Sequence, residues 1–343
     1  MKKILYTFIL LSLINFSLTA GGRSEADRTK SGSSQRQKEV VVYTYDSFVS
    51  DWGAGPEITK KFEQKTGLKL SLVSVGDGAQ ILSRAILEKN DPQADVLLGI
   101  DNNQTDAARK AKILSAYKPS GAEEILSELL FTDDYLLTPF DWSCFALIYD
   151  TQSSVPAPES LEDLTRPEYS KKLILMDPRM STPGLGFAAW TIAVFKDKYL
   201  DFWKHLKPSI LTMAPGWDAG YGLFTHGEAP LVVSYTTSPA YHVEYDKTDR
   251  YKALIFAEGH IMQIEGAGVV KGAQNEKGAK AFMDFLISED AQSIIPLTQW
   301  MYPVNKNTVL PDCYKAAPQA DKKLSVDNAS LGAAVEKIMA AVQ

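Results

Sequence analysis

The sequence contains few cysteines and no excess of basic residues. Two cysteines in 343 residues exclude a disulfide-rich scaffold, so a body of this size must be stabilised by its own apolar core. Lysine and arginine number 36 against 42 aspartate and glutamate, for a formal charge of −6, and this balance argues against the basic surface of a nucleic-acid-binding protein. After residue 18 the sequence has no apolar run long enough to cross a bilayer.

The composition is typical of a globular protein of two domains. Hydrophobic residues make up 45% and charged residues 23% of the sequence, and these proportions exclude wholesale disorder and coiled coil. At roughly 100–200 residues per domain, the length predicts two domains. We expect Cys144 and Cys313 to remain unpaired, because Cys144 lies in an apolar run that is typical of a buried strand.

The N-terminal residues have the pattern of an export signal. Two lysines precede an apolar run over residues 4–18, and small residues follow at a plausible cleavage point. Residues 1–20 are therefore predicted to be a signal peptide, and residues 21–39, rich in Gly, Ser, Arg and Lys, a flexible tether. No cysteine stands at the cleavage point, so a lipoprotein signal is excluded, and an uncleaved anchor is the alternative. We expect an exported, periplasmic protein.

Positive charge is concentrated at this end of the chain. Residues 1–38 carry seven Lys or Arg and two Asp or Glu, a net charge of +5, so the remainder of the chain carries −11. A body of that charge attracts cations and repels anions at long range. The sequence therefore favours a cationic partner over an anionic one, although the same charge also serves solubility.

Strands and helices alternate along the body of the chain. The β-branched and aromatic run 39–45 predicts a buried strand, and a helix from Pro56 to residue 66 follows, ended by Gly67. Further strands are expected at 68–75, 94–99, 145–149, 172–176 and 231–235, and helices at 79–89, from 105, and at 184–195, 220–224 and 278–287. This order indicates an α/β fold whose largely parallel sheet is covered on both faces.

Aromatic and acidic residues gather directly after the predicted strands, whereas lysine and arginine are nearly missing there. Ligands of open α/β sheets bind in these loops, at the carboxyl ends of the strands. The segments concerned are YTYDSF at 43–48, DWG at 51–53, GDG at 76–78, GIDNN at 99–103, DPRMSTPGLG at 177–186, GW at 216–217, SYTTSPAYH at 234–242 and WMYPV at 300–304. Aromatic faces attract cations, and carboxylates accept N–H groups. These segments therefore predict a site for a flat, cationic heteroaromatic ligand. Amides and hydroxyls near residue 181 suit its hydroxyl or phosphate tail.

In this order the segments closely resemble the thiamine-binding proteins of ABC transporters, a group of type II solute-binding proteins. The resemblance extends from about residue 40 to residue 304, and the long segments SYTTSPAYH and DPRMSTPGLG make it specific. It implies a two-lobed periplasmic-binding-protein type II fold with a hinge and a central cleft. One lobe would comprise residues 40–143 plus 267–343, and the other residues 144–266.

The resemblance also implies a ligand, a partner and a set of contacts. The expected ligand is thiamine, with thiamine phosphate and thiamine diphosphate as further forms, and the expected partner is the membrane subunit of an ABC permease. The protein is expected to be a monomeric receptor with no catalytic residues, no cofactor, no metal and no nucleic-acid partner. The ligand-binding positions are Tyr45, Trp52, Ser181, Trp217, Tyr235, Tyr241 and Trp300 from the resemblance, and Asp77 and Ser238 from their position and chemistry.

Each of these residues is given a role. Tyr45, Tyr241 and Trp300 are assigned to ring stacking, Ser181, Trp217 and Tyr235 to hydrogen bonds with the tail, and Asp77 to the aminopyrimidine. For Asp77, a purely structural role as the acid of a Gly-Asp-Gly turn is the alternative.

Two other functions stay open at this point. Thiaminase-like transferases resemble this fold and use a cleft cysteine with an acidic base, which here would be Cys144 with Asp141 or Glu265. Ferric-ion receptors form a neighbouring group and typically carry two adjacent tyrosines, whereas Tyr235 and Tyr241 lie six positions apart. The four histidines also form no ligand-spaced pair. The sequence favours the thiamine receptor over both.

Overall fold

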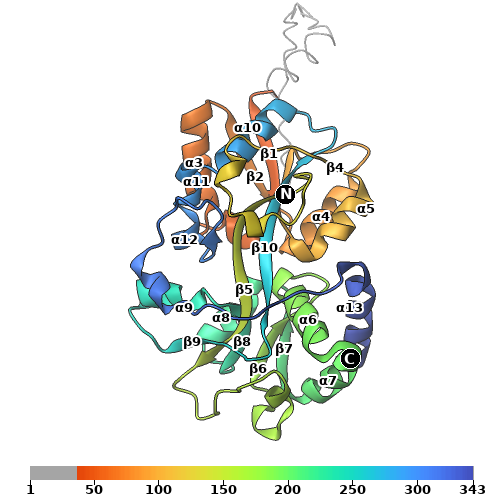
Figure 1. Ribbon diagram of the computed structural model, residues 1–343, viewed down its shortest axis with the longest axis vertical. Coiled ribbons are helices and arrows are strands. Elements are labelled where there is room, and N and C mark those ends of the chain that lie inside the picture. The colour runs from red at the N-terminus through yellow and green to blue at the C-terminus, as the bar shows by residue number, and fades with distance from the viewer. Residues whose placement is uncertain (1–36, 343) are drawn as a thin grey trace, which may run out of the picture. The chain divides into compact units, whose positions relative to one another are not determined.

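Two long strands connect the two lobes of the structure, a computed structural model that describes residues 37–342. β5 (Thr138–Asp150) and β10 (His260–Val270) pair antiparallel, and each runs from the strands of one lobe into the other (Figure 1). The order of the main strands is β2-β1-β3-β10-β5-β8-β6-β7. The predicted signal peptide and residues 21–36 of the predicted tether lie outside the described residues.

The first lobe has a parallel sheet with helices packed against it. Its strands are β1 (Glu39–Thr44), β2 (Lys69–Ser74) and β3 (Val96–Asp101), and its helices are α3 (Gly55–Thr66), α4 (Gly78–Leu87), α5 (Thr105–Ala111) and α10 (Glu276–Leu286). The ring of Phe62 on α3 meets those of Phe282 and Phe285 on α10, with centroids 5.5 and 5.6 Å apart. The helix predicted to stop at Gly67 does so, and that glycine has the left-handed φ of 69° that other residues adopt at a cost.

The second lobe repeats this arrangement around a separate core. Its strands are β6 (Leu173–Met176), β7 (Ile210–Ala214) and β8 (Leu231–Tyr235), and its helices are α6 (Thr182–Phe195), α7 (Tyr199–Leu206) and α8 (Trp217–Thr225). α6 is apolar around most of its circumference and is buried accordingly. Two buried indole N–H groups are satisfied, since Trp190 donates to the carbonyl of Gly259 and Trp203 to the Thr191 hydroxyl. The predicted α/β alternation is thus confirmed in both lobes.

The C-terminal helix α13 (Asn328–Val342) differs from the predicted lobe division, in which residues 267–343 belong to the first lobe. Leu331, Val335 and Ile338 of α13 lie in the core of the second lobe, with Phe202 of α7. The segment before it crosses the hinge, because β12 (Lys323–Leu324) pairs with the start of β10. The other lobe boundaries stay a prediction.

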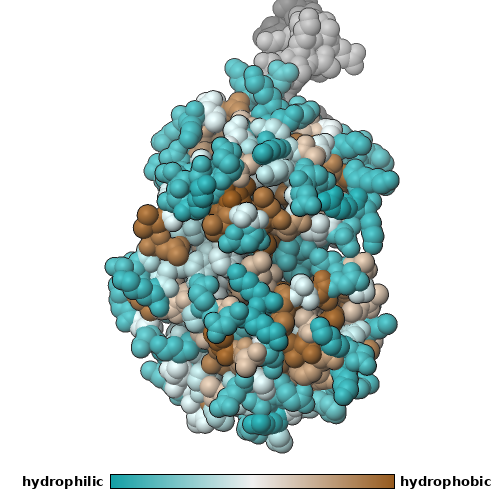
Figure 2. All heavy atoms as spheres, viewed as in Figure 1, coloured by the Kyte–Doolittle hydropathy of each residue, from teal (hydrophilic) through white to brown (hydrophobic). Residues whose placement is uncertain are grey.

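Several shorter helices and strands connect these elements. They are α2 (Asp46–Val49), β4 (Leu114–Ser115), α9 (Ser238–Tyr241), β9 (Tyr251–Leu254), α11 (Glu289–Gln292), α12 (Ile295–Thr298) and β11 (Tyr302–Pro303). The face shown in Figure 2 is mostly hydrophilic, with hydrophobic residues in small separate groups. Among residues 37–342, no helix has both the length and the apolarity that a membrane crossing requires.

Candidate functional site

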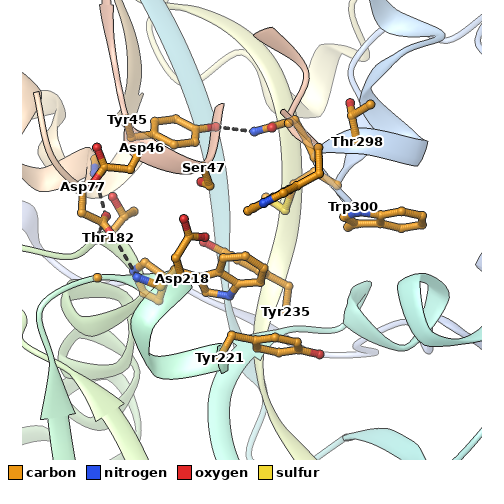
Figure 3. Close-up of a pocket in the computed structure, with 18 of the residues that line it drawn as sticks. Tyr45, Asp46, Ser47, Asp77, Thr182, Asp218, Tyr221, Tyr235, Thr298 and Trp300 are labelled. Carbon is orange, nitrogen blue, oxygen red and sulfur yellow. Dashed lines mark hydrogen bonds between the residues drawn. The ribbon is translucent and has the colours of Figure 1, made fainter. Parts of the chain in front are cut away.

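A cavity of about 1090 Å³ lies between the two lobes. It is lined by residues that follow β1, β2 and β8 and by the first turns of α4, α6 and α8, so the carboxyl ends of several strands meet here. Figure 3 shows Tyr45 and Asp77 on one side of it, facing Asp218, Tyr221 and Tyr235. Its volume is slightly above the range of roughly 300–1,000 Å³ that is usual for small-molecule sites.

The structure brings eight of the nine predicted contact residues to this cavity. They are Tyr45, Trp52, Asp77, Trp217, Tyr235, Ser238, Tyr241 and Trp300. Ser181 is the exception, because it is fully buried directly before α6 and is not one of the residues that line the cavity. Contact of any of the nine with a ligand stays a prediction.

Aromatic side chains form two groups along the cavity. Trp300 meets Tyr241 edge to face, with ring centroids 5.3 Å apart at 83°. On the other side Trp217 stacks on Tyr221 at 4.9 Å and 21°, and Trp52, whose side chain is half exposed, lies 6.2 Å from the Trp217 ring. A flat ligand between these groups would meet an aromatic face or edge on both sides.

Trp300 is held in an unusual backbone conformation. Its φ is 57°, in the left-handed region that non-glycine residues rarely adopt. Such conformations cost of order 1–3 kcal/mol and cluster at functional sites, where the surrounding structure holds them in place. Trp300 in this conformation lines the cavity, and its indole contacts Tyr241.

The cavity is acidic. Six carboxyl side chains line it, whereas none of its lining residues, all within the described chain, is lysine, arginine or histidine. The six acids are Asp46, Asp51, Glu57, Asp77, Asp218 and Glu265. Burial, together with the charges of Asp77 and Asp46, raises the pKa of Asp218 to about 6. Arg179, the basic residue of the segment 177–186, binds Asp177 through its Nη2 at 2.6 Å instead of reaching the cavity.

Asp77 does not present a free carboxylate to the cavity. Its Oδ1 accepts the backbone N–H of Gly78 at 2.6 Å and that of Thr182 at 3.1 Å, and its Oδ2 accepts the backbone N–H of Trp217 at 2.9 Å. Burial raises the pKa of Asp77, and the backbone donors of Trp217, Thr182 and Gly78 oppose that rise. Asp77 therefore has the structural role that the sequence analysis considered as its alternative, since it caps α4 with a full capping box.

Trp217 also uses its polar group within the protein. Its indole Nε1 donates to the Ser234 hydroxyl at 2.9 Å, and that hydroxyl lies 2.8 Å from the Ser238 hydroxyl. The predicted role of Trp217 as a side-chain donor to the ligand therefore fits the geometry less well than a stacking role. Its ring, stacked on Tyr221, is placed for the latter.

Glu265 is a cavity residue that the sequence reasoning did not assign to ligand binding. It lies on β10, opposite Asp141 on β5, and accepts hydrogen bonds from Tyr45 Oη at 2.7 Å and Gln263 Nε2 at 2.6 Å. Gln299 in turn donates to Tyr45 Oη at 2.6 Å. Burial, reinforced by Asp101 and Asp77, raises the pKa of Glu265 to about 8. No strong signal in the sequence marks it, because β10, whose sequence is HIMQIEGAGVV, was not predicted as a strand.

Asp141 is buried beside Glu265, but within the described chain its carboxyl takes no part in the hydrogen bonds around Glu265. The residue is fully buried, and neither carboxyl oxygen finds a hydrogen-bond partner within residues 37–342. Burial and the neighbouring Glu265 raise its pKa well above the ordinary value. Two carboxyls this close disfavour double ionisation, so the pair holds at least one proton near neutral pH.

Cys144, the proposed nucleophile of the enzyme alternative, does not reach the cavity. It lies on β5 opposite Met262, is 3% exposed and is not one of the lining residues. Burial raises the pKa of its thiol to about 11, whereas a nucleophilic cysteine needs a lowered pKa. Cys144 and Cys313 are both free and buried, as expected from the sequence.

The buried histidines are held in protein hydrogen bonds. His242 bonds Tyr221 Oη at 2.8 Å and Asp246 at 2.7 Å, and His260 accepts the N–H of Phe256 at 2.8 Å. Burial lowers the pKa of both, which favours neutral rings. Within residues 37–342, no three His, Cys, Asp or Glu side chains are grouped so that they could hold a metal ion.

Comparisons with known proteins agree with this architecture. The family model of bacterial extracellular solute-binding proteins matches residues 91–324. A thiamine-binding periplasmic protein of Brucella abortus is 41% identical over 92% of this chain and 93% of its own, and one of Escherichia coli is 40% identical over 79% and 82%. A solved structure of a periplasmic thiamin-binding protein superposes with a TM-score of 0.85, at 37% identity over 89% of this chain and 96% of that chain.

These matches agree with the observed topology, in which two α/β lobes are joined by crossing strands around one cavity. The two-lobed fold expected from the sequence is confirmed. The chain belongs to the bacterial extracellular solute-binding proteins.

Proposed function

We propose that this protein is the thiamine receptor of an ABC transporter, which captures the vitamin outside the cytoplasmic membrane and delivers it to the membrane permease. The observation that carries the proposal is an interlobe cavity lined by aromatic rings and six acids and by no basic residue. Thiamine is a flat cation, because its thiazolium ring carries a permanent positive charge and its aminopyrimidine donates N–H groups. Relatives named for thiamine binding, about 40% identical to this chain, support the same ligand.

The aromatic residues supply the stacking part of the proposed site. Trp300 and Tyr241 would face one ring of the ligand, and the stacked Trp217 and Tyr221 would face the other. A cation against a desolvated aromatic face gains about 2 kcal/mol. Glu265, which lines the cavity and is buried, would ionise when the cation binds and form a charge pair with it away from water.

Thiamine phosphate and thiamine diphosphate are further candidate ligands of the same site. The first turns of α6 and α8 open on the cavity, and helix N-termini favour phosphate groups. The six acids act in the opposite direction. The order of affinity among the three forms therefore shows whether the helix N-termini or the acidic side chains have the stronger electrostatic effect on the tail of the ligand.

The receptor is proposed to be non-catalytic, monomeric and periplasmic. A buried thiol whose pKa is about 11 supports binding without cleavage, because cleavage by the thiaminase route needs a thiolate. The periplasmic location rests on the export pattern at residues 1–20 and on relatives described as periplasmic.

Calorimetric titration with the three thiamine forms tests the proposal. At least one form is expected to bind in the micromolar range or tighter, and Trp300→Ala should weaken that binding by about 3- to 30-fold, the size of one stacking contact. Tyr199→Ala is the matched control, since this aromatic lies on α7 outside the cavity. Dissociation constants above about 1 mM for all three forms would refute the proposal.

A further inference from the structure

The carboxylate of Asp77 joins the two lobes. Asp77 stands at the start of α4 in the first lobe, and there it caps its own helix through the N–H of Gly78. Its two other hydrogen bonds come from the second lobe, from the N–H of Thr182 at the start of α6 and from that of Trp217 at the start of α8. Figure 3 shows both of these bonds as dashed lines that converge on one side chain.

Three helix N-termini thus converge on one negative charge. α4, α6 and α8 have 10, 14 and 9 residues, so each has the partial positive charge that aligned peptide dipoles place at a helix start. Hydrogen bonds to a charged acceptor are about twice as strong as those between neutral groups. The second lobe supplies the Thr182 and Trp217 donors, so separating the lobes would leave those two N–H groups without the carboxylate.

The backbone around Asp77 is shaped for this close approach. A Cβ atom on Gly78 would collide with the Thr182 hydroxyl, and one on Gly216 would lie 2.9 Å from Asp77 Oδ2. Neither glycine has a positive φ, so the turn geometry does not require glycine at these two positions. The absence of a side chain there lets the starts of α4, α6 and α8 meet.

We propose that Asp77 is a positioning residue that latches the cleft closed by binding the starts of α6 and α8 across it. In this role Asp77 holds the lobes together around a ligand, and slows its release, without needing to touch the ligand. The effect on ligand release rests on the proposed thiamine function, whereas the effect on lobe separation does not. A latch role also explains why this acid of the cavity uses its carboxylate oxygens to accept hydrogen bonds from the protein backbone.

Two variants separate the latch from the helix cap. Asp77→Ser keeps a hydroxyl cap for α4 but is too short to retain both bonds across the cleft, and Asp77→Asn keeps the size of the side chain but loses the charge. Asp101→Asn is the matched control. Asp101 is likewise a first-lobe cap with a capping box, and its carboxylate bonds only its own loop, at Asn103 and Gln104.

The lobe separation is measured directly by pulsed electron resonance between two spin labels. Lys60→Cys on α3 and Lys204→Cys on α7 place the labels on exposed positions of opposite lobes, and the two native cysteines are buried. Stopped-flow fluorescence on the same proteins without labels gives the association and dissociation rates of thiamine.

Both Asp77 variants are expected to shift the ligand-free distance distribution toward longer distances, relative to the unaltered protein and to Asp101→Asn. Thiamine dissociation should become at least about tenfold faster, with association changed less than about threefold, because two charge-assisted bonds are lost. Identical distance distributions overturn the proposal, including the case in which dissociation alone changes, since that result marks a direct ligand contact. A distance shift in a protein that binds no thiamine upholds the latch and refutes the proposed function.

Discussion

Replacing Glu265 with glutamine is expected to weaken the pH dependence of protein stability. The Glu265 carboxyl is 7% exposed, accepts hydrogen bonds from Tyr45 and Gln263 and lies opposite Asp141 across the β10–β5 pair. Its pKa is raised from 4.5 to about 8, first by burial and then by the nearby Asp101. Glutamine keeps the shape of the side chain and one acceptor oxygen, but it cannot ionise.

The sign of this pH dependence follows from the fact that the folded protein holds the Glu265 proton more tightly than the unfolded chain does. Because the pKa of Glu265 is higher in the folded protein, its contribution to stability is complete below about pH 4 and is lost as the pH rises toward 8. At about 1.4 kcal/mol per pKa unit, a shift from 4.5 to about 8 corresponds to about 5 kcal/mol. Asp141 competes for the same proton, so the part that Glu265→Gln removes should be smaller than this.

Urea unfolding at pH 5, 7 and 9 measures this difference. The free energy of unfolding should fall between pH 5 and pH 9 by more in the unaltered protein than in Glu265→Gln. Asp101, with a pKa of about 7, and Asp141 titrate in both proteins but are coupled to Glu265, so the difference between the two pH profiles reports Glu265 together with that coupling. Parallel pH profiles for the two proteins would refute the account of Glu265 as a buried, largely protonated acid.

The same substitution should also change the protons exchanged on binding. A thiamine cation near Glu265 favours the ionised carboxylate, so binding at pH 7 should release a large fraction of one proton. Calorimetry in two buffers of different ionisation enthalpy measures that release, which should disappear in Glu265→Gln. Glu258→Gln is the control, because burial also raises the pKa of Glu258 but that residue does not line the cavity. Equal proton release in all three proteins would contradict a charge pair between Glu265 and the ligand.

Three further predictions concern single side chains. Trp300→Ala should weaken thiamine binding about 3- to 30-fold, and unchanged affinity would exclude a stacking role. Some loss of stability should accompany it, because Trp300 is buried and alanine keeps the Cβ that the left-handed backbone disfavours. Cys144→Ser should leave the recovery of intact thiamine after prolonged incubation unchanged, whereas thiamine loss that stops in this variant would establish an enzyme. Gly186→Ala should destabilise the protein by about 1–3 kcal/mol in urea unfolding, because its Cβ would overlap the Phe145 ring, while Gly332→Ala, with open space around it, should not.

Local sequence patterns predicted most of the parallel strands and the helices between them, but they missed β7 and α7 of the second lobe. The run 39–45 is β-branched and apolar, and α3 carries both a proline at its start and Gly67 at its end, so local chemistry alone determines these elements. β10 was missed because HIMQIEGAGVV contains two glycines and a buried acid, which resemble a loop. Its strand geometry comes from pairing with β3 and β5, partners that are distant in the sequence.

The site was predictable to the extent that it depends on strand ends. Residues such as Tyr45 and Tyr235 follow buried strands, and the rule that ligands bind there was enough to bring them to one cavity. The pairing of Glu265 with Asp141, and the use of the Asp77 oxygens by two helices of the other lobe, depend on how the lobes meet. No local pattern encodes that geometry. The placement of α13 in the second lobe depends likewise on a crossing of the hinge that apolar spacing does not reveal.

Equilibrium dialysis of the purified protein against thiamine, with chromatographic recovery of the vitamin, tests the central claim most directly. The account predicts one thiamine bound per chain at micromolar concentration or below, with all of it recovered chemically intact after release. Failure to retain thiamine at about 1 mM would contradict the proposed ligand, and recovery of cleaved thiamine would contradict the proposed non-catalytic receptor.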